Sequence, residues 1–407
     1  MQRISGKSLL LIFILLQSLR LISQTQLPDV LSLDPSMLHR AKELISSGSR
    51  DVMPAYAALI KDADKDLLKG PYSVKDKTKT PPDGDKHNYF TLAVYWWPNP
   101  NTKDGLPYIY KDGVTNPDSK IGTDARELVQ MCNSVFTLAL AYYFSGEAKY
   151  AKHASELLKA WFIDSKTKMN PNLNYAQAIP GRNEGSPGGI IDSRNFINIT
   201  EAAGLLEGSA SWTESDHVQL QSWFKDYLKW LITSKNGEDE SEAKNNHATF
   251  YCAQVVNFAL FSGDRETASQ YLEKAKELIA SQIDPDGSQP YELKRTKSFS
   301  YSVFNLEAFY LLAEMGNKLN ADLYNYQTDD GRSLHKALDY LAPYADPSKK
   351  WSGKEISGME EFRTELGYLL LISSLRYPHG NYADTLMKDY PKEIQKKRSL
   401  LLYPIER

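Results

Sequence analysis

The sequence predicts an all-α fold, an incomplete (α/α) toroid built from antiparallel helical hairpins with long loops. Three observations predict it. Apolar residues recur at helical spacing through most of the 407 residues, strand patterns are scarce, and one Ser-Gly turn appears twice, as FSGE at 144–147 and FSGD at 261–264. Short turns of this kind join antiparallel helices. Hairpins that follow one another along a chain favour a ring whose inner helices line a cleft.

The N-terminal stretch precedes this helical region and differs from it. Arg3 and Lys7 stand before an apolar run from Leu9 to Leu16, and small residues follow before Gln24. That order is typical of a secretory signal peptide, and its apolar part is too short for a membrane span. We expect residues 1–23 to be removed, leaving a periplasmic or secreted protein with no membrane span.

The rest of the sequence gives no sign of a domain boundary. No linker rich in Gly, Ser or Pro divides residues 24–407, so we expect a single domain, and we expect it to be a monomer. Only YFTLAVYWW at 89–97 alternates as a strand would, and the loops at 68–123 and 165–191 exceed the usual length, which favours a functional role. The expected helices are, in order, 36–48, 52–67, 124–144, 146–164, 192–208, 214–233, 249–264, 265–287, 299–316, 333–344, 360–376 and a segment from about 381.

Composition excludes some classes of function. The formal net charge is −3, so there is no basic excess to release counterions from phosphates, and nucleic-acid binding is not expected. The 25 Tyr and 7 Trp supply amphipathic rings that suit a sugar-binding cleft. Cys132 and Cys252 lie inside apolar helical patterns and read as buried small hydrophobes rather than a disulfide. The seven histidines are scattered without metal-ligand spacing, so neither a metal nor another cofactor is expected.

The run NNHATFY at 245–251 places two amides and an imidazole where an apolar helix begins. A capping role explains one of Asn245, Asn246 and His247, but not all three. Backbone N–H groups and the positive end of the dipole favour an anion at a helix N-terminus. With the side chains added, this stretch predicts a pocket suited to a carboxylate.

A second polar run, YELKRTKSFSYSVFN at 291–305, contains Arg295 and Tyr301 near the start of another helix. Six residues of one continuous helix would turn the two side chains about 120° apart, at about 100° per residue. They converge only if Arg295 belongs to the preceding loop. The alternative is a surface arginine and a core tyrosine.

Two further stretches offer groups that bind sugars. YWWPNP at 95–100 carries Trp96 and Trp97, which form either a sugar platform or one core ring capped by the other. GRNEGSPGGIIDSRNF at 181–196 offers Asn183, Arg194 and Asn195 on a glycine-rich backbone that a ligand can approach closely. The alternative there is an irregular loop with Asp192 or Ser193 as the N-cap of the next helix.

An amide, an imidazole, a guanidinium and a phenol, without an obvious nucleophile, suit β-elimination from a uronic acid. The C5 proton is weakly acidic because its removal places negative charge beside a carboxylate. Donors and cations that neutralise this carboxylate allow the charge to spread into it. A phenol whose pKa is lowered from about 10 by a neighbouring cation would take the proton and return one to the glycosidic oxygen.

The ordered set YWWPNP, GSPGGIIDSRNF, NNHATFY and ELKRTKSFSYSVFNLEAF, over residues 85 to 320, resembles the alginate lyase superfamily of α/α-toroid polysaccharide lyases. The resemblance implies a secreted enzyme that cleaves a uronate polymer by elimination. It assigns Asn246 and His247 to carboxylate neutralisation and proton removal, with Arg295 as the arginine and Tyr301 as the catalytic tyrosine. In those lyases the arginine-to-tyrosine gap is one residue longer, which here falls on Ser302. Tyr251 and Tyr291 are the other candidate phenols.

Alginate, with a preference for mannuronate, is the expected substrate, and glucuronan or another uronan is the alternative within the same chemistry. A glycoside hydrolase of toroid fold would instead need two carboxylates, for which Glu184, Asp192 and the acidic run 237–242 are candidates. An acidic run is more commonly a solvated loop. A secreted glycan-binding protein without activity would account for Trp96 and Trp97, but not for the polar cluster.

Overall fold

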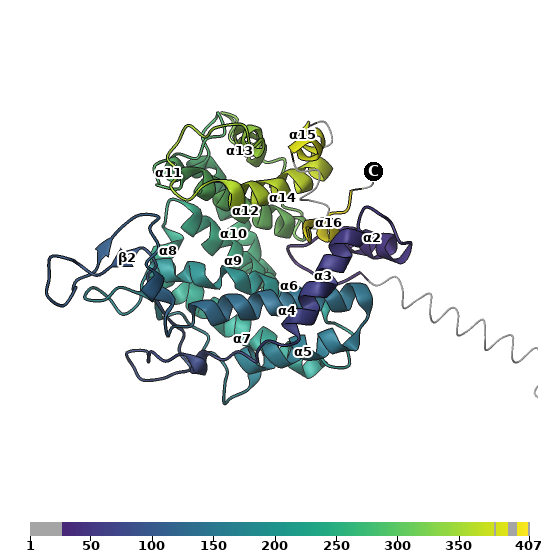
Figure 1. Ribbon diagram of the computed structural model, residues 1–407. Helices are drawn as coiled ribbons and strands as arrows, with labels where there is room; N and C mark the ends of the chain where they lie inside the picture. The colour runs from purple at the N-terminus through teal and green to yellow at the C-terminus, as the bar shows by residue number, and fades with distance from the viewer. Residues whose placement is uncertain (1–26, 378–379, 390–396, 406–407) are drawn as a thin grey trace, which may run out of the picture.

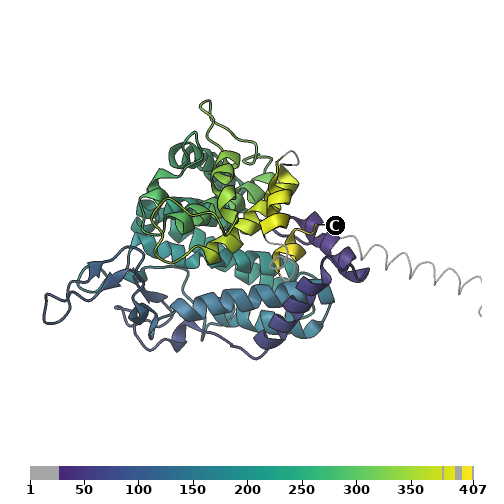
Figure 2. The same ribbon diagram turned by 45° about the horizontal axis from the view of Figure 1, so that its top comes forward.

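The computed structural model describes residues 27–377, 380–389 and 397–405. The expected signal peptide lies outside these residues. Helices dominate the described chain, and Figures 1 and 2 show them packed side by side with the longer connections gathered at their ends. The prediction of an all-α toroid is confirmed by the way these helices pair and follow one another.

The inner helices form a succession in which each packs on the next. In chain order they are α4 (Ala125–Ser145), α6 (Ile197–Leu205), α9 (Asn246–Phe261), α12 (Ser298–Asn317) and α14 (Glu360–Arg376). Almost every residue of α9 and most of α12 are buried, so neither helix has a polar face turned to solvent. A helix that is apolar all round belongs in the interior of a protein, and this explains their central position.

Amphipathic helices cover this inner layer. They are α3 (Met53–Asp66), α5 (Ala148–Leu158), α7 (Glu214–Thr233), α10 (Arg265–Gln282) and α13 (Leu334–Leu341). Both expected Ser-Gly turns are confirmed: Gly146 and Gly263 adopt φ of 73° and 81°, which reverse the chain between α4 and α5 and between α9 and α10.

The two ends of the described chain meet at one side of the molecule. The short helix α16 (Ser399–Leu402) packs on α2 (Pro35–Ser46) and on α3, as Figure 1 shows. At the end of α14, the Arg376 guanidinium lies 2.9 Å from carboxylate oxygens of both Asp34 and Glu314. The N-terminal segment therefore closes against the last inner helices.

The expected strand at 89–97 is corrected by the structure, because it is two strands in two different sheets. β1 (Phe90–Leu92) pairs in parallel with β4 (Tyr175–Ala178), and β2 (Trp96–Trp97) pairs antiparallel with β3 (Ile109–Tyr110). Each pairing partner lies inside a segment that the sequence predicted as a loop. Figure 1 shows the β2 segment projecting at the same end of the molecule as α8 and α11.

Other boundaries differ for local reasons. The helix expected from 192 is preceded by a 3-10 stretch, η4 (Pro187–Phe196), and the acidic run expected as a loop is the helix α8 (Lys235–Ser241). The remaining elements are η1 (Val74–Asp76), η2 (Pro117–Lys120), the π turn η3 (Lys159–Ile163), α11 (Pro290–Leu293), η5 (Ala342–Ala345) and α15 (Tyr382–Asp389).

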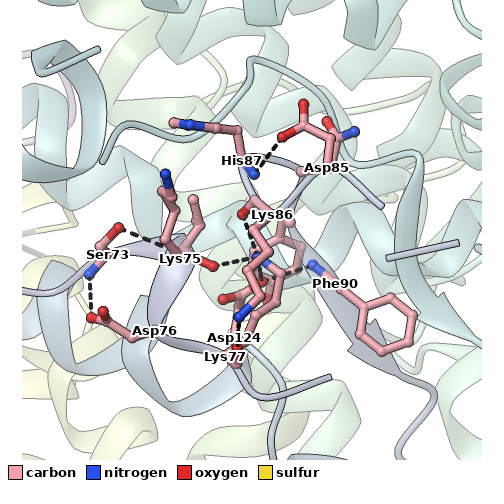
Figure 3. A network of polar contacts seen from close by, with 12 residues as sticks. Ser73, Lys75, Asp76, Lys77, Asp85, Lys86, His87, Phe90 and Asp124 are labelled. Carbon is pink, nitrogen blue, oxygen red and sulfur yellow. Dashed lines mark hydrogen bonds and ion pairs between the residues drawn. The ribbon is translucent and has the colours of Figure 1, made fainter. Parts of the chain in front are cut away.

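A buried ion pair fixes the long connection between α3 and α4 (Figure 3). The Lys77 ammonium lies 3.0 Å from Asp124 Oδ2, and neither side chain is more than 1% exposed. Lys77 also donates to the carbonyl oxygen of Lys86, and Asp124 accepts the backbone N–H of Phe90 at 2.8 Å. These contacts hold β1 against the start of α4, which positions the segment that follows it.

The two cysteines, Cys132 on α4 and Cys252 on α9, are both buried and free, as expected from their apolar surroundings. Across the described residues, the helices are either too short or too polar to cross a membrane.

Candidate active site

A cavity of about 580 Å³ collects the residues of the two polar runs. Its lining includes Asn245, Asn246, His247, Arg295 and Tyr301, which come from the starts of α9 and α12 and from the loop before α12. Two larger cavities, of about 800 and 780 Å³, are lined by none of these residues. The 580 Å³ cavity is therefore the candidate active site, and we call it the cleft.

The N-terminus of α9 already holds an anion from within the protein. Asn246 donates its backbone N–H and its side-chain amide to Glu292 Oε1 on α11, at 2.7 and 2.9 Å. Glu292 is 1% exposed and Asn246 2% exposed. Glu292 therefore occupies the Asn246 N–H, and this donor is not free for a ligand. Asn245, at the N-cap position, makes no capping bond with its side chain, which lines the cleft.

A buried network of amides supports this arrangement from below. Asn305 on α12 donates to Gln282 and Gln289 at 2.9 and 2.8 Å, and Thr249 on α9 donates to Gln282 at 3.0 Å. Gln289 immediately precedes α11 and donates in turn to the carbonyl oxygen of Ser302 at 2.9 Å. The starts of α9, α11 and α12 are thereby fixed to one another.

The imidazole of His247 is held by an acid that the sequence prediction placed in a solvated loop. Nδ1 lies 2.6 Å from Oε1 of Glu240, which is 4% exposed on α8. Burial opposes a charge on His247, but the carboxylate of Glu240 outweighs it and raises the pKa of His247 above its ordinary 6.5.

Arg295 lies in the loop between α11 and α12, so the condition for its convergence with Tyr301 is confirmed. Its guanidinium lies over the Tyr301 ring, 4.2 Å from the ring centroid. Nε and Nη2 donate to Asp112 Oδ1 at 3.0 and 2.7 Å, and the Tyr110 hydroxyl donates to the same oxygen at 2.9 Å. Asp112 follows β3 in residues 94–116, which carry β2 and β3 and which we call the β2–β3 segment, and its carboxylate fixes the arginine on the tyrosine.

Tyr301 shares a hydrogen bond of 2.7 Å with the hydroxyl of Tyr95. Burial, followed by the contact with Tyr95, raises the pKa of Tyr301 above 10, and the nearby charge of Arg295 only partly offsets this. The expectation of a lowered pKa is therefore corrected. Its phenol keeps its proton at neutral pH.

Two of the other predicted residues also line the cleft. Trp96 faces it, with Arg182 over its ring at 4.9 Å and Tyr110 at 5.5 Å between ring centroids. Arg194 lines it as well, and its guanidinium lies 5.3 Å from the ring centroid of Phe304. Asp192 is not an N-cap, because its carboxylate accepts from Thr91 and Gln177 at 2.8 Å each.

The structure does not bring the remaining five predicted residues into the cleft: Trp97, Asn183, Asn195, Tyr251 and Tyr291. The indole N–H of Trp97 donates to the carbonyl oxygen of Val114, and Asn183 accepts the N–H of Ile179 within its own loop. Tyr251 is 1% exposed and donates to the carbonyl oxygen of Leu231. Tyr291 lines a separate cavity of about 430 Å³.

Other residues of the cleft were missed. They include Tyr89, Tyr95, Tyr110, Lys120, Gln177, Phe304 and Phe362. Tyr95 belongs to the quoted YWWPNP run and could have been selected as a phenol beside two tryptophans. Gln177 could not, because its signal is a backbone φ of 48°, a strained value for a residue other than glycine. Within the described residues, no group of three or more His, Cys, Asp or Glu is placed to hold a metal ion.

Comparison with known proteins shows the family to which a chain with this cleft belongs. The family model described as alginate lyase matches residues 73–351, which include every residue of the cleft that lies on β2, β3, α9 and α12. The chain belongs to the alginate lyase family. The crystal structure of an alginate lyase from Bacteroides ovatus is similar to this one, with a TM-score of 0.89. The two sequences are 37% identical, and the match covers 93% of this chain and 100% of that chain.

Alginate lyase A1-III from Sphingomonas species A1 has a similar fold at 18% identity, with 94% of this chain and 99% of that chain covered and a TM-score of 0.58. Among curated proteins, no relative matches the chain. Membership of the alginate lyase family makes this protein a polysaccharide lyase. The hydrolase and the inactive binding protein are set aside, and the proposed hydrolytic carboxylate Asp192 is engaged in the hydrogen bonds described above.

Proposed function

We propose that this alginate lyase family member cleaves alginate by β-elimination in the cleft, with Tyr301 as the base and acid. His247 and Arg295 neutralise the uronate carboxylate, and Asn245 and Asn246 supply amide contacts beside them. The observation that carries the proposal is the convergence of an imidazole, a guanidinium and a phenol on one cavity. The names of the similar structures support alginate as the polymer.

The chemistry follows from where charge develops. As the C5 proton leaves, negative charge grows on the neighbouring carboxylate, and fixed cations at that point lower the barrier. Arg295 is fixed by Asp112, and His247 by Glu240, so neither must reorganise during the reaction. Each cation stays paired with a carboxylate on its far side, which leaves its remaining N–H groups for the substrate.

Tyr301 must lose its proton before it can act as the base. Burial and Tyr95 favour the neutral phenol, whereas Arg295 over the ring favours the phenolate. The active form is therefore a minor one at neutral pH, and its fraction increases as pH rises. After taking the C5 proton, the phenol is placed to give it to the glycosidic oxygen as the bond at C4 breaks.

Spacing along the chain supports the choice of Tyr301. Variants of alginate lyase A1-III in which one histidine is changed to alanine or one tyrosine to phenylalanine have structures with a bound tetrasaccharide. Those two positions are 54 residues apart, and His247 and Tyr301 are 54 residues apart as well. The arginine, and not the tyrosine, is then the residue displaced by one position, so the tyrosine corresponds to Tyr301 and not to Ser302.

The remainder of the cleft suits a polymer. Trp96 and Tyr110 present aromatic rings, and Arg194 and Lys120 present cations for further carboxylates of an anionic chain. We further propose that residues 1–23 direct export, that residues 24–407 form one domain, and that the protein acts as a monomer on mannuronate-rich alginate.

A panel of uronan polymers tests the proposal. Elimination leaves a C4–C5 double bond that absorbs ultraviolet light, so we expect absorbance to rise with polymannuronate and to be lost in His247→Ala. A rise with glucuronan alone would redirect the substrate while keeping the chemistry. New reducing ends without absorbance would overturn elimination.

A further inference from the structure

The acidic helix α8 contains one carboxylate that differs from its neighbours. Glu238 and Asp239 are exposed, whereas Glu240 is 4% exposed. Gly237 lies three residues before Glu240 and therefore on the same face of the helix. A Cβ built on Gly237 would lie 1.8 Å from the carbonyl oxygen of Leu231, so only glycine lets α8 approach the end of α7 this closely. This approach turns Glu240 into the protein.

The imidazole of His247 is confined between two elements. On one side Nδ1 contacts Glu240 Oε1 at 2.6 Å. On the other, Gly188 of η4 lies so close that a Cβ there would be 3.4 Å from Cε1 of the imidazole. His247 lines the cleft, and within the described chain its Nε2 makes no hydrogen bond to a protein group. The ring orientation therefore leaves Nε2 for a ligand.

We propose that Glu240 is a positioning residue that fixes the imidazole of His247 and keeps it positively charged, so that Nε2–H donates to the uronate carboxylate. This inference takes the uronate ligand from the proposed function. The charge of the imidazole does not depend on that function. A neutral imidazole whose Nε2 acts as a base is the competing arrangement. A carboxylate on Nδ1 orients such a ring in either case, so the charge decides between them.

All charged groups that face His247 enter this balance. Burial lowers its pKa, and so does the positive charge of Arg295 in the loop before α12. Glu240 on α8 raises the pKa through charge and hydrogen bond, and Glu292 on α11 adds to it, so that the net direction is upward. Because the folded-state pKa is raised, the imidazolium persists above pH 6.5 and is lost only as pH rises through that higher value.

Glu240→Gln tests the charge while keeping the shape of the side chain. Glu238→Gln, the same change at an exposed position of α8, is the matched control. We expect Glu240→Gln to lower the His247 pKa, measured by NMR titration of the imidazole signals, with the His247 signal identified by its loss in His247→Gln. We also expect kcat/KM to fall about 10- to 100-fold, by analogy with the loss seen when a carboxylate that orients a metal-bound histidine is removed. Glu238→Gln should leave both unchanged.

The two proposals fail in different ways. A His247 pKa at or below 6.5 in the unmodified protein would overturn the role of Glu240, whether or not the variants fold and whatever the lyase assay shows. An unchanged His247 titration in folded Glu240→Gln would do the same. A raised pKa that falls in Glu240→Gln supports the positioning role, even if the uronan panel then assigns a different polymer.

Discussion

At the scale of single residues, two phenols compete for the role of base, because Tyr301 and Tyr95 share one hydrogen bond. The Arg295 guanidinium lies 4.2 Å from the centroid of the Tyr301 ring, whereas the cation over Tyr95 is the Lys297 ammonium at 5.9 Å. We expect Tyr301→Phe to lower kcat by about 10²- to 10⁴-fold, the contribution of general acid–base catalysis, and Tyr95→Phe to lower it far less. Ultraviolet assays of both folded variants measure the difference. The reverse order of effects would assign the base to Tyr95.

The pH dependence of the unmodified enzyme follows from two raised pKa values. Below the pKa of His247 the imidazolium is fully present, so kcat/KM should follow the phenolate fraction of Tyr301 and rise about tenfold per pH unit. Above it, each gain in phenolate is offset by loss of imidazolium, and the profile levels off. Because the pKa of His247 is raised, we expect levelling above pH 6.5. A profile that declines from pH 5 upward would contradict these roles.

The sequence indicated cleft residues where polar side chains stand in an otherwise apolar helix. Two amides and an imidazole at the head of an apolar helix have no role in packing, and Asn245, Asn246 and His247 do line the cleft. Glu240 carried no such signal, because its neighbours in the acidic run are solvated and only the packing of Gly237 distinguishes it. Tyr251, another candidate phenol, does not line the cleft. Its hydroxyl donates to a backbone carbonyl oxygen inside the protein, and the sequence does not distinguish such a phenol from one that faces a ligand.

At the scale of elements, the β2–β3 segment is attached to the start of α12 by one carboxylate. Asp112 accepts from Arg295, from the Thr296 N–H at 2.9 Å and from the Tyr110 hydroxyl. These partners lie more than 180 residues away along the chain, except for Tyr110. No local pattern predicts such a contact, which explains why helix positions were predicted well and the site's long-range support was not.

Asp112→Ala should therefore loosen the β2–β3 segment without unfolding the helices. We expect faster hydrogen exchange at the amides of Lys111 and Asn116, which bond to Tyr95 and Val94, and a loss of activity because Arg295 is no longer fixed. Asp104→Ala, at the exposed turn of the same segment, is the control. If exchange and activity in Asp112→Ala match the control, Asp112 does not hold the segment.

At the scale of the whole molecule, the cleft is assembled from parts of the chain that only the packed set of inner helices brings together. Its lining runs from Tyr89 to Phe362. The order of helices and their two hairpin turns could be predicted, since both depend on local spacing. The position of the long connection between α3 and α4 depends instead on the buried contact of Lys77 with Asp124 (Figure 3).

This ion pair makes a prediction about stability. Burial raises the pKa of Asp124 to about 7 even beside Lys77, so Lys77→Met leaves a buried carboxyl without its partner, and we expect it to lower the free energy of unfolding by about 1–3 kcal/mol. Lys77→Met with Asp124→Asn should recover much of this loss, because the asparagine is neutral and still accepts the Phe90 N–H. Chemical denaturation of both variants measures the difference.

Lys75→Met, at an exposed position of η1 two residues before Lys77, is the control and should stay within about 0.5 kcal/mol of the unmodified protein. Asp124 holds Phe90, which is next to the cleft residue Tyr89, and β1 leads on to Tyr95, which also lines the cleft. Lys77→Met should therefore also lose activity at temperatures where it remains folded. A double variant no more stable than Lys77→Met would show that the loss comes from packing around the lysine stem and not from the unpaired carboxyl of Asp124.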